Sequence, residues 1–380
     1  MEAKVQAVLD AEPGSAPERA PGTFPSRWFA VGDPQCSLER LARVLCEAGL
    51  LGDHGALRED VGLVSLGDHF DYGDDRAVAA REGLRVLRWL TGHPPWQVRV
   101  LLGNHDAARV QEFAGVSDAR FEEAFAAARG LDGDPAAAAR HREAFPKLPV
   151  WNLVARDYSS FTSEQRALVR ELLLAGRYAL GLAAALPDGT PALLTHAGVT
   201  RRELRLLGLD AATRDAAAVA RALQAALSAA VEAVRDDWRA GGEAPLRLAP
   251  LHHAGDAERE GGGLLYHRPS NSERSRDGWS WDEGRPRRFD PRTLPLGLAQ
   301  VAGHTGHHKC LKELGAWATE EARAVPRGGL RTLASDGQSA RYELGLHPPQ
   351  GSEATLYLAD AELSRAEVWP VPLLALGGVP

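Results

Sequence analysis

The sequence predicts an α/β fold in which two mixed β-sheets pack together and are flanked by helices. Apolar runs that close on a Gly-Asp or Gly-Asn pair alternate with segments of helical periodicity, as in a parallel sheet with crossover helices. The residues that close the first three runs, Asp33, Asp68 and Asn104, lie 35 and 36 positions apart, the length of a strand–helix–strand unit. Residues 329–371 instead alternate apolar and polar side chains, which is typical of antiparallel strands in a second sheet.

The composition is that of an ordinary folded protein. The 380 residues are 44% hydrophobic and 25% charged, which allows a sizeable core. A net charge of −7 argues against general nucleic-acid binding. Three cysteines are too few for a disulfide framework, so we expect a reducing, cytoplasmic setting. The N-terminal residues lack the apolar core of a signal peptide and no run of 18 apolar residues occurs, so we expect neither secretion nor membrane insertion.

The chain begins with a segment that resembles a tail. Residues 1–26 are rich in Pro, Ala and Glu and predict a disordered or loosely docked arm, so the folded domain is expected to span 27–380. Its first strand, 28–31, runs into Gly-Asp-Pro-Gln. After this turn, Ser37 is expected to cap a helix whose apolar residues keep helical spacing.

The strand–loop–helix pattern then repeats. A strand over 61–66 runs into Gly-Asp-His-Phe-Asp, and a helix over 75–90 follows. The third strand, 98–102, runs into Gly-Asn-His-Asp. Because consecutive parallel strands end at the same edge of a sheet, their closing side chains are expected to lie together there.

Two longer segments interrupt this pattern. Residues 107–190 are mostly of helical composition, with Pro146 and Pro149 as breaks, and we expect a helical insertion that borders the site. Residues 241–290 are rich in Gly, Arg, Ser and Pro and predict an irregular insertion, which in a compact domain is usually functional or mobile.

Two further strands also end in polar residues. A strand over 192–194 leads to His196, and a strand over 298–302 leads to His304. An Ala-rich helix is expected over 214–240 between them.

The side chains at these strand ends suit divalent cations. They are carboxylates, carboxamides and imidazoles without a thiolate, a set that favours Mn²⁺, Fe²⁺ or Zn²⁺. Two such ions about 3.5–4 Å apart can clamp a phosphoryl group and activate a hydroxide for in-line attack. The candidate metal ligands are Asp33, Gln35, Asp68, Asn104, His196 and His304.

In order and spacing, these motifs resemble those of the calcineurin-like metallophosphoesterase superfamily. The series is Gly-Asp-x-x, Gly-Asp-x-x-Asp, Gly-Asn-His-Asp, His-Ala-Gly and Gly-His, and it extends from residue 32 to 308. The wording Leu-Thr-His-Ala-Gly-Val is further similar to the phosphoprotein-phosphatase and diadenosine-tetraphosphatase branch. The resemblance implies a four-layer α/β/β/α sandwich and hydrolysis of phosphate esters by a hydroxide that bridges two metal ions.

The resemblance also implies a role for each residue. Asp68 would bridge the two ions and Asp33 would ligate the first. The ligands of the second ion would be Asn104, His196 and His304. His105 would be the general acid that protonates the leaving oxygen, held and tuned by Asp71, and a carboxylate beside an imidazole does favour its cationic form.

The first departure from the family pattern affects the metal. Gln35 stands where the family usually has the His of Asp-x-His. Its carbonyl oxygen can still ligate, and a neutral oxygen in place of imidazole should favour a harder ion, so Mn²⁺ is expected before Fe or Zn. Gly306 occupies the last position of the Gly-His-x-His motif, which leaves open whether His307 or His308 ligates an ion.

The second departure affects the substrate. The phosphatase branch has Gly-Asp-x-x-Asp-Arg-Gly, and Tyr72 stands in the Arg position here. The candidates to replace this phosphate-binding arginine are Arg109 and Arg268.

The expected function is phosphomonoester hydrolysis, with a phosphorylated small molecule, a nucleotide or a phosphoprotein as substrate and no membrane or nucleic-acid partner. An alternative is hydrolysis of a nucleotide pyrophosphate bond, in a dinucleoside polyphosphate or ADP-ribose, which Gln35 and the missing arginine favour. A third possibility is a metal-binding scaffold without activity. The retention of both His105 and Asp71 argues against it.

Several other side chains are expected to be structural. They are His69, Asp106 and the buried thiols Cys36 and Cys310, with His252 and His253 at the surface. Residues 266–268, Tyr-His-Arg, fit either core packing or a turn that faces the substrate.

Overall fold

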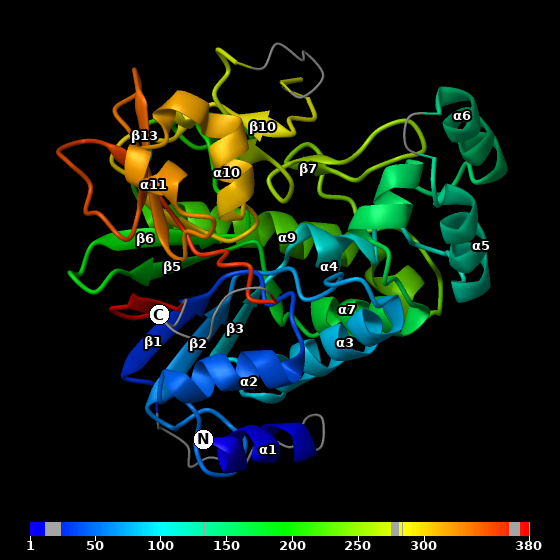
Figure 1. The fold of residues 1–380 in the computed structure, drawn as a ribbon, viewed down its shortest axis with the longest axis horizontal. Helices are drawn as coiled ribbons and strands as arrows, with labels where there is room; N and C mark the ends of the chain where they lie inside the picture. Colours follow the sequence, from blue (N-terminus) through cyan, green and yellow to red (C-terminus); the bar gives the residue numbers. More distant parts are fainter. Residues whose placement is uncertain (12–23, 132–133, 275–280, 283, 365–372, 380) are drawn as a thin grey trace.

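Two β-sheets pack face to face and helices cover both outer faces, which gives the predicted α/β/β/α sandwich (Figure 1). The computed structural model describes residues 1–11, 24–131, 134–274, 281–282, 284–364 and 373–379.

The first sheet has the strand order β15-β1-β2-β3-β4. Strands β1, β2 and β3 are parallel and adjacent in chain order, as the 35- and 36-residue spacings predict. Strand β4 extends the sheet in parallel, and β15 pairs with β1 in the antiparallel sense. The bounds are β1 Arg27–Val31, β2 Val61–Ser65, β3 Val98–Leu101, β4 Tyr178–Ala179 and β15 Leu373–Leu376.

The second sheet has the order β13-β12-β14-β11-β6-β5. Its central strands β6, β11 and β14 are parallel, whereas β5, β12 and β13 join in the antiparallel sense. The alternating segment therefore supplies strands of a second sheet, although 365–372 lie outside the described residues. The bounds are β5 Gly181–Ala185, β6 Pro191–Thr195, β11 Ala299–Ala302, β12 Arg331–Ser335, β13 Ala340–Leu344 and β14 Ala354–Leu358.

Alternate residues of the strands divide between the layers. Ala30, Val64, Leu194, Val301 and Tyr357 face the other sheet and are buried in one shared core. Their neighbours along the strands face the covering helices. Burial of apolar area at about 25 cal/mol per Å² on both faces explains why the central strands are almost wholly apolar.

Helices α2 and α3 pack on the outer face of the first sheet, and α9 packs on the second sheet at β5 and β6. Ser37 caps α2 as predicted, accepting from the backbone N–H of Arg40 at 3.2 Å. By length and composition alone α9 could cross a membrane, but its buried face lies against the sheet. The bounds are α2 Leu38–Glu47, α3 Arg76–Gly92, α8 Arg201–Leu206, α9 Ala216–Arg239, α10 His307–Leu314 and α11 Glu320–Ala324.

The helical insertion is shorter than predicted. It ends with α7, because Tyr178 and the residues after it form strands β4 and β5 rather than helix. Figure 1 shows α5 and α6 projecting from the body of the molecule. The bounds are α4 Asn104–Ala108, α5 Asp118–Ala128, α6 Pro135–Ala144, the π-helix η1 Leu153–Asp157 and α7 Ser163–Leu174.

The two segments predicted to lack regular structure differ from each other. Residues 2–10 form the helix α1 (Glu2–Asp10), whose Val5 and Val8 are buried against α2, while 12–23 lie outside the described residues. The described residues of 241–290, which leave out 275–280 and 283, are largely irregular as predicted and contribute short two-residue strands. These are β7 His252–His253, β8 Gly262–Gly263, β9 Arg268–Pro269 and β10 Arg288–Phe289.

Candidate metal centre

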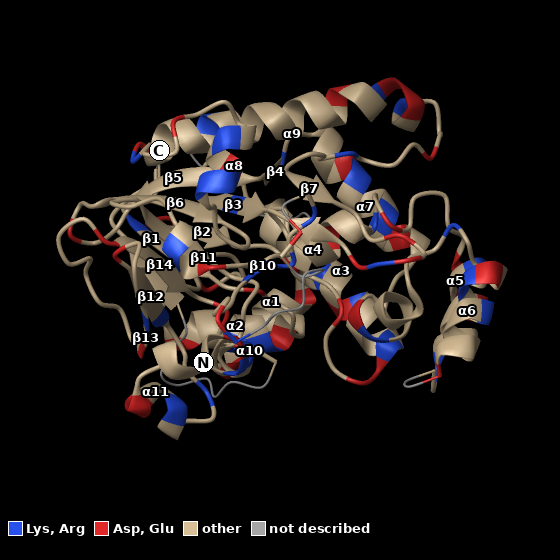
Figure 2. Ribbon diagram, turned by 90° about the horizontal axis from the view of Figure 1, so that it is seen from above, with Lys and Arg blue, Asp and Glu red and all other residues tan. Residues whose placement is uncertain are grey.

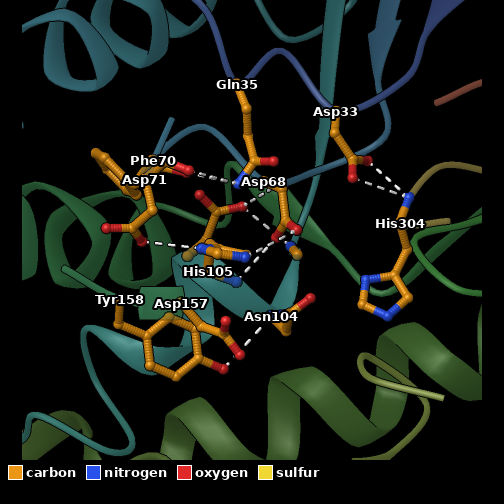
Figure 3. A network of polar contacts seen from close by, with 12 residues as sticks. Asp33, Gln35, Asp68, Phe70, Asp71, Asn104, His105, Asp157, Tyr158 and His304 are labelled. Carbon is orange, nitrogen blue, oxygen red and sulfur yellow. Dashed lines mark hydrogen bonds and ion pairs between the residues drawn. The ribbon is translucent and has the colours of Figure 1, made fainter. Parts of the chain in front are cut away.

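The carboxyl ends of the parallel strands of both sheets meet at one site. Asp33, Asp68 and Asn104 follow β1, β2 and β3, and His196 and His304 follow β6 and β11. All five side chains are buried. The structure therefore brings together the predicted ligands from segments up to 271 residues apart (Figure 3).

A cluster of ligand atoms lies at the centre of this site. Asp68, His196 and His304 each offer one ligand atom, and these atoms lie within 4.8 Å of one another. The Oδ1 atom of Asn104 lies 3.2 Å from Nε2 of His196. Carboxylate, carboxamide and imidazole donors at this separation can hold a divalent cation.

Hydrogen bonds on the far side of each imidazole fix which nitrogen faces the cluster. His196 Nδ1 lies 2.8 Å from the carbonyl oxygen of Leu66, and His304 Nε2 lies 2.8 Å from that of Tyr266. A carbonyl oxygen only accepts, so both of these nitrogens carry the proton. The opposite nitrogens, His196 Nε2 and His304 Nδ1, are left with lone pairs for a metal, which is the usual arrangement of metal-ligating histidines.

Burial and mutual charge interactions shift the pKa values of the clustered side chains. Burial opposes charge on Asp68, but His196 and His105 outweigh it and hold the pKa of this carboxyl below its usual range. Burial likewise opposes charge on His196, yet mainly Asp68 raises its pKa to about 9. Burial, with the charges of Arg268 and His196, lowers the pKa of His304 well below its usual range. Without a metal, the cluster therefore holds a positive charge on one imidazole.

The backbone is strained at the same residues. Asp68, Asp71 and His304 have φ of 56°, 64° and 61°, a left-handed conformation that non-glycine residues rarely adopt. Strain of this kind costs of order 1–3 kcal/mol per residue and clusters at functional sites. Gly103 allows the close packing of Asp68, because a Cβ on Gly103 would lie 2.2 Å from the Oδ1 atom of Asp68.

Asp33 lies beside the cluster rather than within it. Its carboxylate accepts from the backbone N–H of His304 at 2.8 Å. Burial, followed by the nearby carboxylate of Asp360, raises the pKa of Asp33 well above its usual range. A cation would relieve the repulsion between these two acids. Sequence analysis missed Asp360, although it follows strand β14 as the other acids follow theirs.

Gln35 lies on the same side as Asp33 (Figure 3). Its amide nitrogen donates to the carbonyl oxygen of Phe70 at 2.7 Å. The amide is thereby oriented, and its Oε1 atom forms no hydrogen bond within the described part of the chain. The predicted role of Gln35 as an oxygen ligand is compatible with this orientation.

His105 and Asp71 form the predicted pair. Nδ1 of His105 lies 2.9 Å from Oδ2 of Asp71, and Nε2 of His105 lies 3.8 Å from Oδ2 of Asp68. Burial opposes charge on His105, but Asp68 and Asp71 together raise its pKa. The imidazole is thus held toward its proton-donating form, beside the candidate metal ligands.

Asp71 is itself held by two residues. Arg109 NH1 lies 2.7 Å from its Oδ2 atom, and the backbone N–H and hydroxyl of Ser160 donate to its Oδ1 atom at 2.9 and 2.6 Å. Arg109 is completely buried. Its charge is used to hold Asp71, and its burial disfavours the predicted role of Arg109 in substrate binding.

Tyr158 reaches the site from the helical insertion, directly after the π-helix η1. Its ring packs edge-on to His105 with centroids 5.1 Å apart, and its hydroxyl lies 3.4 Å from Nδ2 of Asn104. It orients the amide so that Oδ1 faces the cluster. Sequence analysis missed Tyr158 and Ser160, since no local motif marks them. A π-turn next to a site is a common functional feature, but only the folded backbone reveals it.

Cationic side chains lie beside His304. The guanidinium of Arg268 lies over the ring of Tyr266 at 5.3 Å, and its Nε atom is buried without a hydrogen-bond partner among the described residues. Its charge is the main cause of the lowered pKa of Lys309, which sequence analysis missed. Arg268 is therefore available to bind an anion, as the prediction of a phosphate-binding arginine requires.

Several histidines and two cysteines near the site have structural contacts. His69 is structural, because its Nδ1 atom lies 2.9 Å from Asp106, whose carboxylate also accepts the backbone N–H groups of Asp68 and Gly103. His307 bonds to the hydroxyl of Tyr342 and to backbone carbonyls, so it is not a metal ligand here. Cys36 and Cys310 are buried free thiols, as predicted. His252 was predicted at the surface, and it is buried.

Comparison with known proteins gives little. No family model matches the chain, and no curated protein does. A solved cold-active protein tyrosine phosphatase is similar at 15% identity and a TM-score of 0.37, over 77% of this chain and 71% of that one. The phosphatase domain of the Legionella effector WipB is similar at 13% identity and a TM-score of 0.29, over 72% and 82%. At these identities and TM-scores the similarity does not indicate a function for this chain, and the site geometry is considered by itself.

Proposed function

We propose that the chain is a metal-dependent phosphoester hydrolase of the calcineurin-like metallophosphoesterase type. The observation that carries this proposal is the convergence of Asp68, Asn104, His196 and His304 beside the His105–Asp71 pair. A purely structural metal site would need the ligand cluster but no proton donor such as the His105–Asp71 pair. Together they are the components that phosphoryl transfer to water requires.

The residues fit two divalent cations, with Asp68 shared between them. Asp33 and Gln35 would hold the first. The second would be held by Asn104, His196 and His304. When bound, Mn²⁺, or Fe or Zn in its place, would polarise the phosphoryl group and activate water.

Side chains of the protein supply proton donation and phosphate binding. Protonated His105 donates from Nε2 to the leaving oxygen, because its Nδ1 atom is occupied by Asp71 at 2.9 Å. Asp71 keeps the ring oriented and stabilises its positive charge. Arg268 binds a phosphate oxygen of the substrate. We propose a phosphomonoester substrate, on a small molecule, a nucleotide or a protein side chain.

The test is a phosphoester panel assayed with the Mn²⁺-loaded full chain. We expect release of inorganic phosphate from p-nitrophenyl phosphate or phosphopeptides. Asp68→Asn should lower the rate at least about 100-fold, because it removes the shared ligand. Asp74→Asn, an exposed carboxylate on the same loop, is the matched control and should retain the wild-type rate.

A nucleotide pyrophosphate hydrolase is the second candidate. It is favoured by Gln35 in place of histidine and by the burial of Arg109, whose guanidinium pairs with Asp71 and is not exposed to a terminal phosphate. Release of nucleoside monophosphate from dinucleotides or ADP-ribose, without phosphate from the monoesters, would select it. Hydrolysis of no member of the panel would reject both and select an inactive scaffold.

A further inference from the structure

A cavity with a basic wall lies away from the candidate metal centre. A cavity of about 420 Å³ occurs where the edge strands β4 and β5 of the two sheets lie under α9. Figure 2 shows these elements side by side. No residue that lines the cavity is among the candidate metal ligands.

The cavity wall is basic. Arg99 comes from β3, Arg177 from the turn before β4 and Arg221 from α9, and none of the described residues that line the cavity is acidic. Arg177 donates at 2.9 Å to the carbonyl oxygen of His93, a neutral group, and forms no ion pair within the described part of the chain. Burial, followed by the charge of Arg99, lowers the pKa of Arg177. The guanidinium of Arg177 therefore lies in a partly dehydrated and positively charged setting, where a bound anion would stabilise it.

The other lining residues complete a small-molecule site. The side-chain oxygen of Gln224 is buried without a hydrogen-bond partner among the described residues, and its amide can turn to present either end to a ligand. Leu182, Ala183 and Ala220 supply an apolar wall. The volume falls in the range of about 300–1,000 Å³ that is usual for small-molecule pockets.

We infer that this cavity binds a small phosphate-bearing anion through Arg177 and Arg221. Guanidinium groups match phosphate oxygens in a bidentate way, and they favour phosphate over a simple monovalent ion. The apolar wall would contact the organic part of such a ligand. This site is separate from the proposed catalytic function and does not depend on it.

The test is calorimetric titration of inorganic phosphate into the full chain at constant ionic strength, set with chloride. Arg221→Glu and Arg177→Gln should each weaken one phosphate site at least about tenfold, since a charge-assisted hydrogen bond contributes about 1.5–3 kcal/mol. Arg239→Glu, which lies on the same helix 18 residues further along, is the charge-matched control and should bind like wild type.

A variant of the metal centre separates the two sites. In Asp68→Asn the cavity site should persist, whatever the metal centre binds. Circular dichroism checks that each variant is folded, and Gln224→Leu serves as a further cavity variant that removes no charge. The inference is wrong if Arg221→Glu and Arg177→Gln keep every phosphate site of the wild type at unchanged affinity. It is also wrong if Asp68→Asn abolishes all phosphate binding.

Discussion

Nε2 of His196 lies 3.1 Å from Nδ1 of His304, and in the neutral rings both atoms present lone pairs because the opposite nitrogen of each ring donates to a backbone carbonyl. Two lone pairs at this distance repel unless a proton or a metal ion lies between them. The acceptor oxygens of Asp68 and Asn104 face the same point. A proton on His196, whose pKa is raised to about 9, meets this requirement, and we propose that a divalent metal ion takes the place of that proton.

Replacement of the proposed acid should separate catalysis from metal binding. His105→Ala removes the proton donor but none of the proposed ligands, so turnover should fall about 10²–10⁴-fold while metal content stays unchanged. The loss should be smaller for p-nitrophenyl phosphate than for phenyl phosphate, whose leaving group needs the proton more. Steady-state kinetics on both substrates, with metal analysis, checks this. Loss of metal in His105→Ala would contradict the assignment.

The hydroxyl of Ser160 should matter through Asp71. Ser160→Ala removes the 2.6 Å hydrogen bond to Asp71 but keeps the backbone one, so kcat should fall roughly 3- to 10-fold with KM nearly unchanged. Ser159→Ala is the matched control. Ser159 is the preceding residue, and its hydroxyl forms no hydrogen bond among the described residues; only its backbone oxygen accepts one, from Arg76. An equal effect of both variants on kcat would show that Ser160 does not position the pair.

Arg268 should affect substrate affinity. Arg268→Ala removes a guanidinium without a carboxylate partner among the described residues, so KM should rise about 10- to 100-fold with a smaller change in kcat. Lys312→Ala removes an exposed cation of α10 and should leave KM unchanged. An unchanged KM in Arg268→Ala would exclude it as the phosphate-binding residue.

Glu112 should make stability depend on pH. Burial raises the pKa of its carboxyl from 4.5 to about 7, since Oε1 has one backbone partner and Oε2 has none. The folded chain binds this proton more tightly than the unfolded chain. Stability is therefore lost as pH rises from 4.5 to 7, by roughly 3 kcal/mol above pH 7.

The variant Glu112→Gln removes this titration. Its melting temperature should exceed that of wild type at pH 8, and the difference should shrink toward pH 4.5. Glu59→Gln, an exposed carboxylate, should show no such trend. Parallel melting curves of Glu112→Gln and wild type across this pH range would contradict the account.

The sequence predicts the frame of the site because strand ends carry local signals. Apolar runs that close on Gly-Asp or Gly-Asn mark the edge of the sheet, and parallel topology then brings Asp33, Asp68 and Asn104 together. Asp360 also follows an apolar strand, β14, but Ala359 stands before it in place of glycine, so the Gly-Asp signal does not mark it. Glycines such as Gly103 follow the same logic, since the packing of Asp68 excludes a side chain there.

The support of the site is not readable from local sequence. Tyr158 and Ser160 reach Asn104 and Asp71 only because the insertion folds back over the first sheet. The burial of Arg109 depends on the same tertiary contact. The sequence does not reveal this contact, and it therefore did not indicate that Arg109 pairs with Asp71. Helical periodicity reports which face of a helix is apolar, not which distant segment covers it.

Metal stoichiometry tests the central claim most directly. Elemental analysis of the Mn²⁺-reconstituted full chain after gel filtration should find two ions per chain. His304→Ala should retain at most one, because it removes a ligand of the second ion, while the exposed neighbour variant His308→Ala should retain both. Wild-type protein without bound metal, or His304→Ala with the wild-type content, would contradict the assignment of a binuclear metal centre.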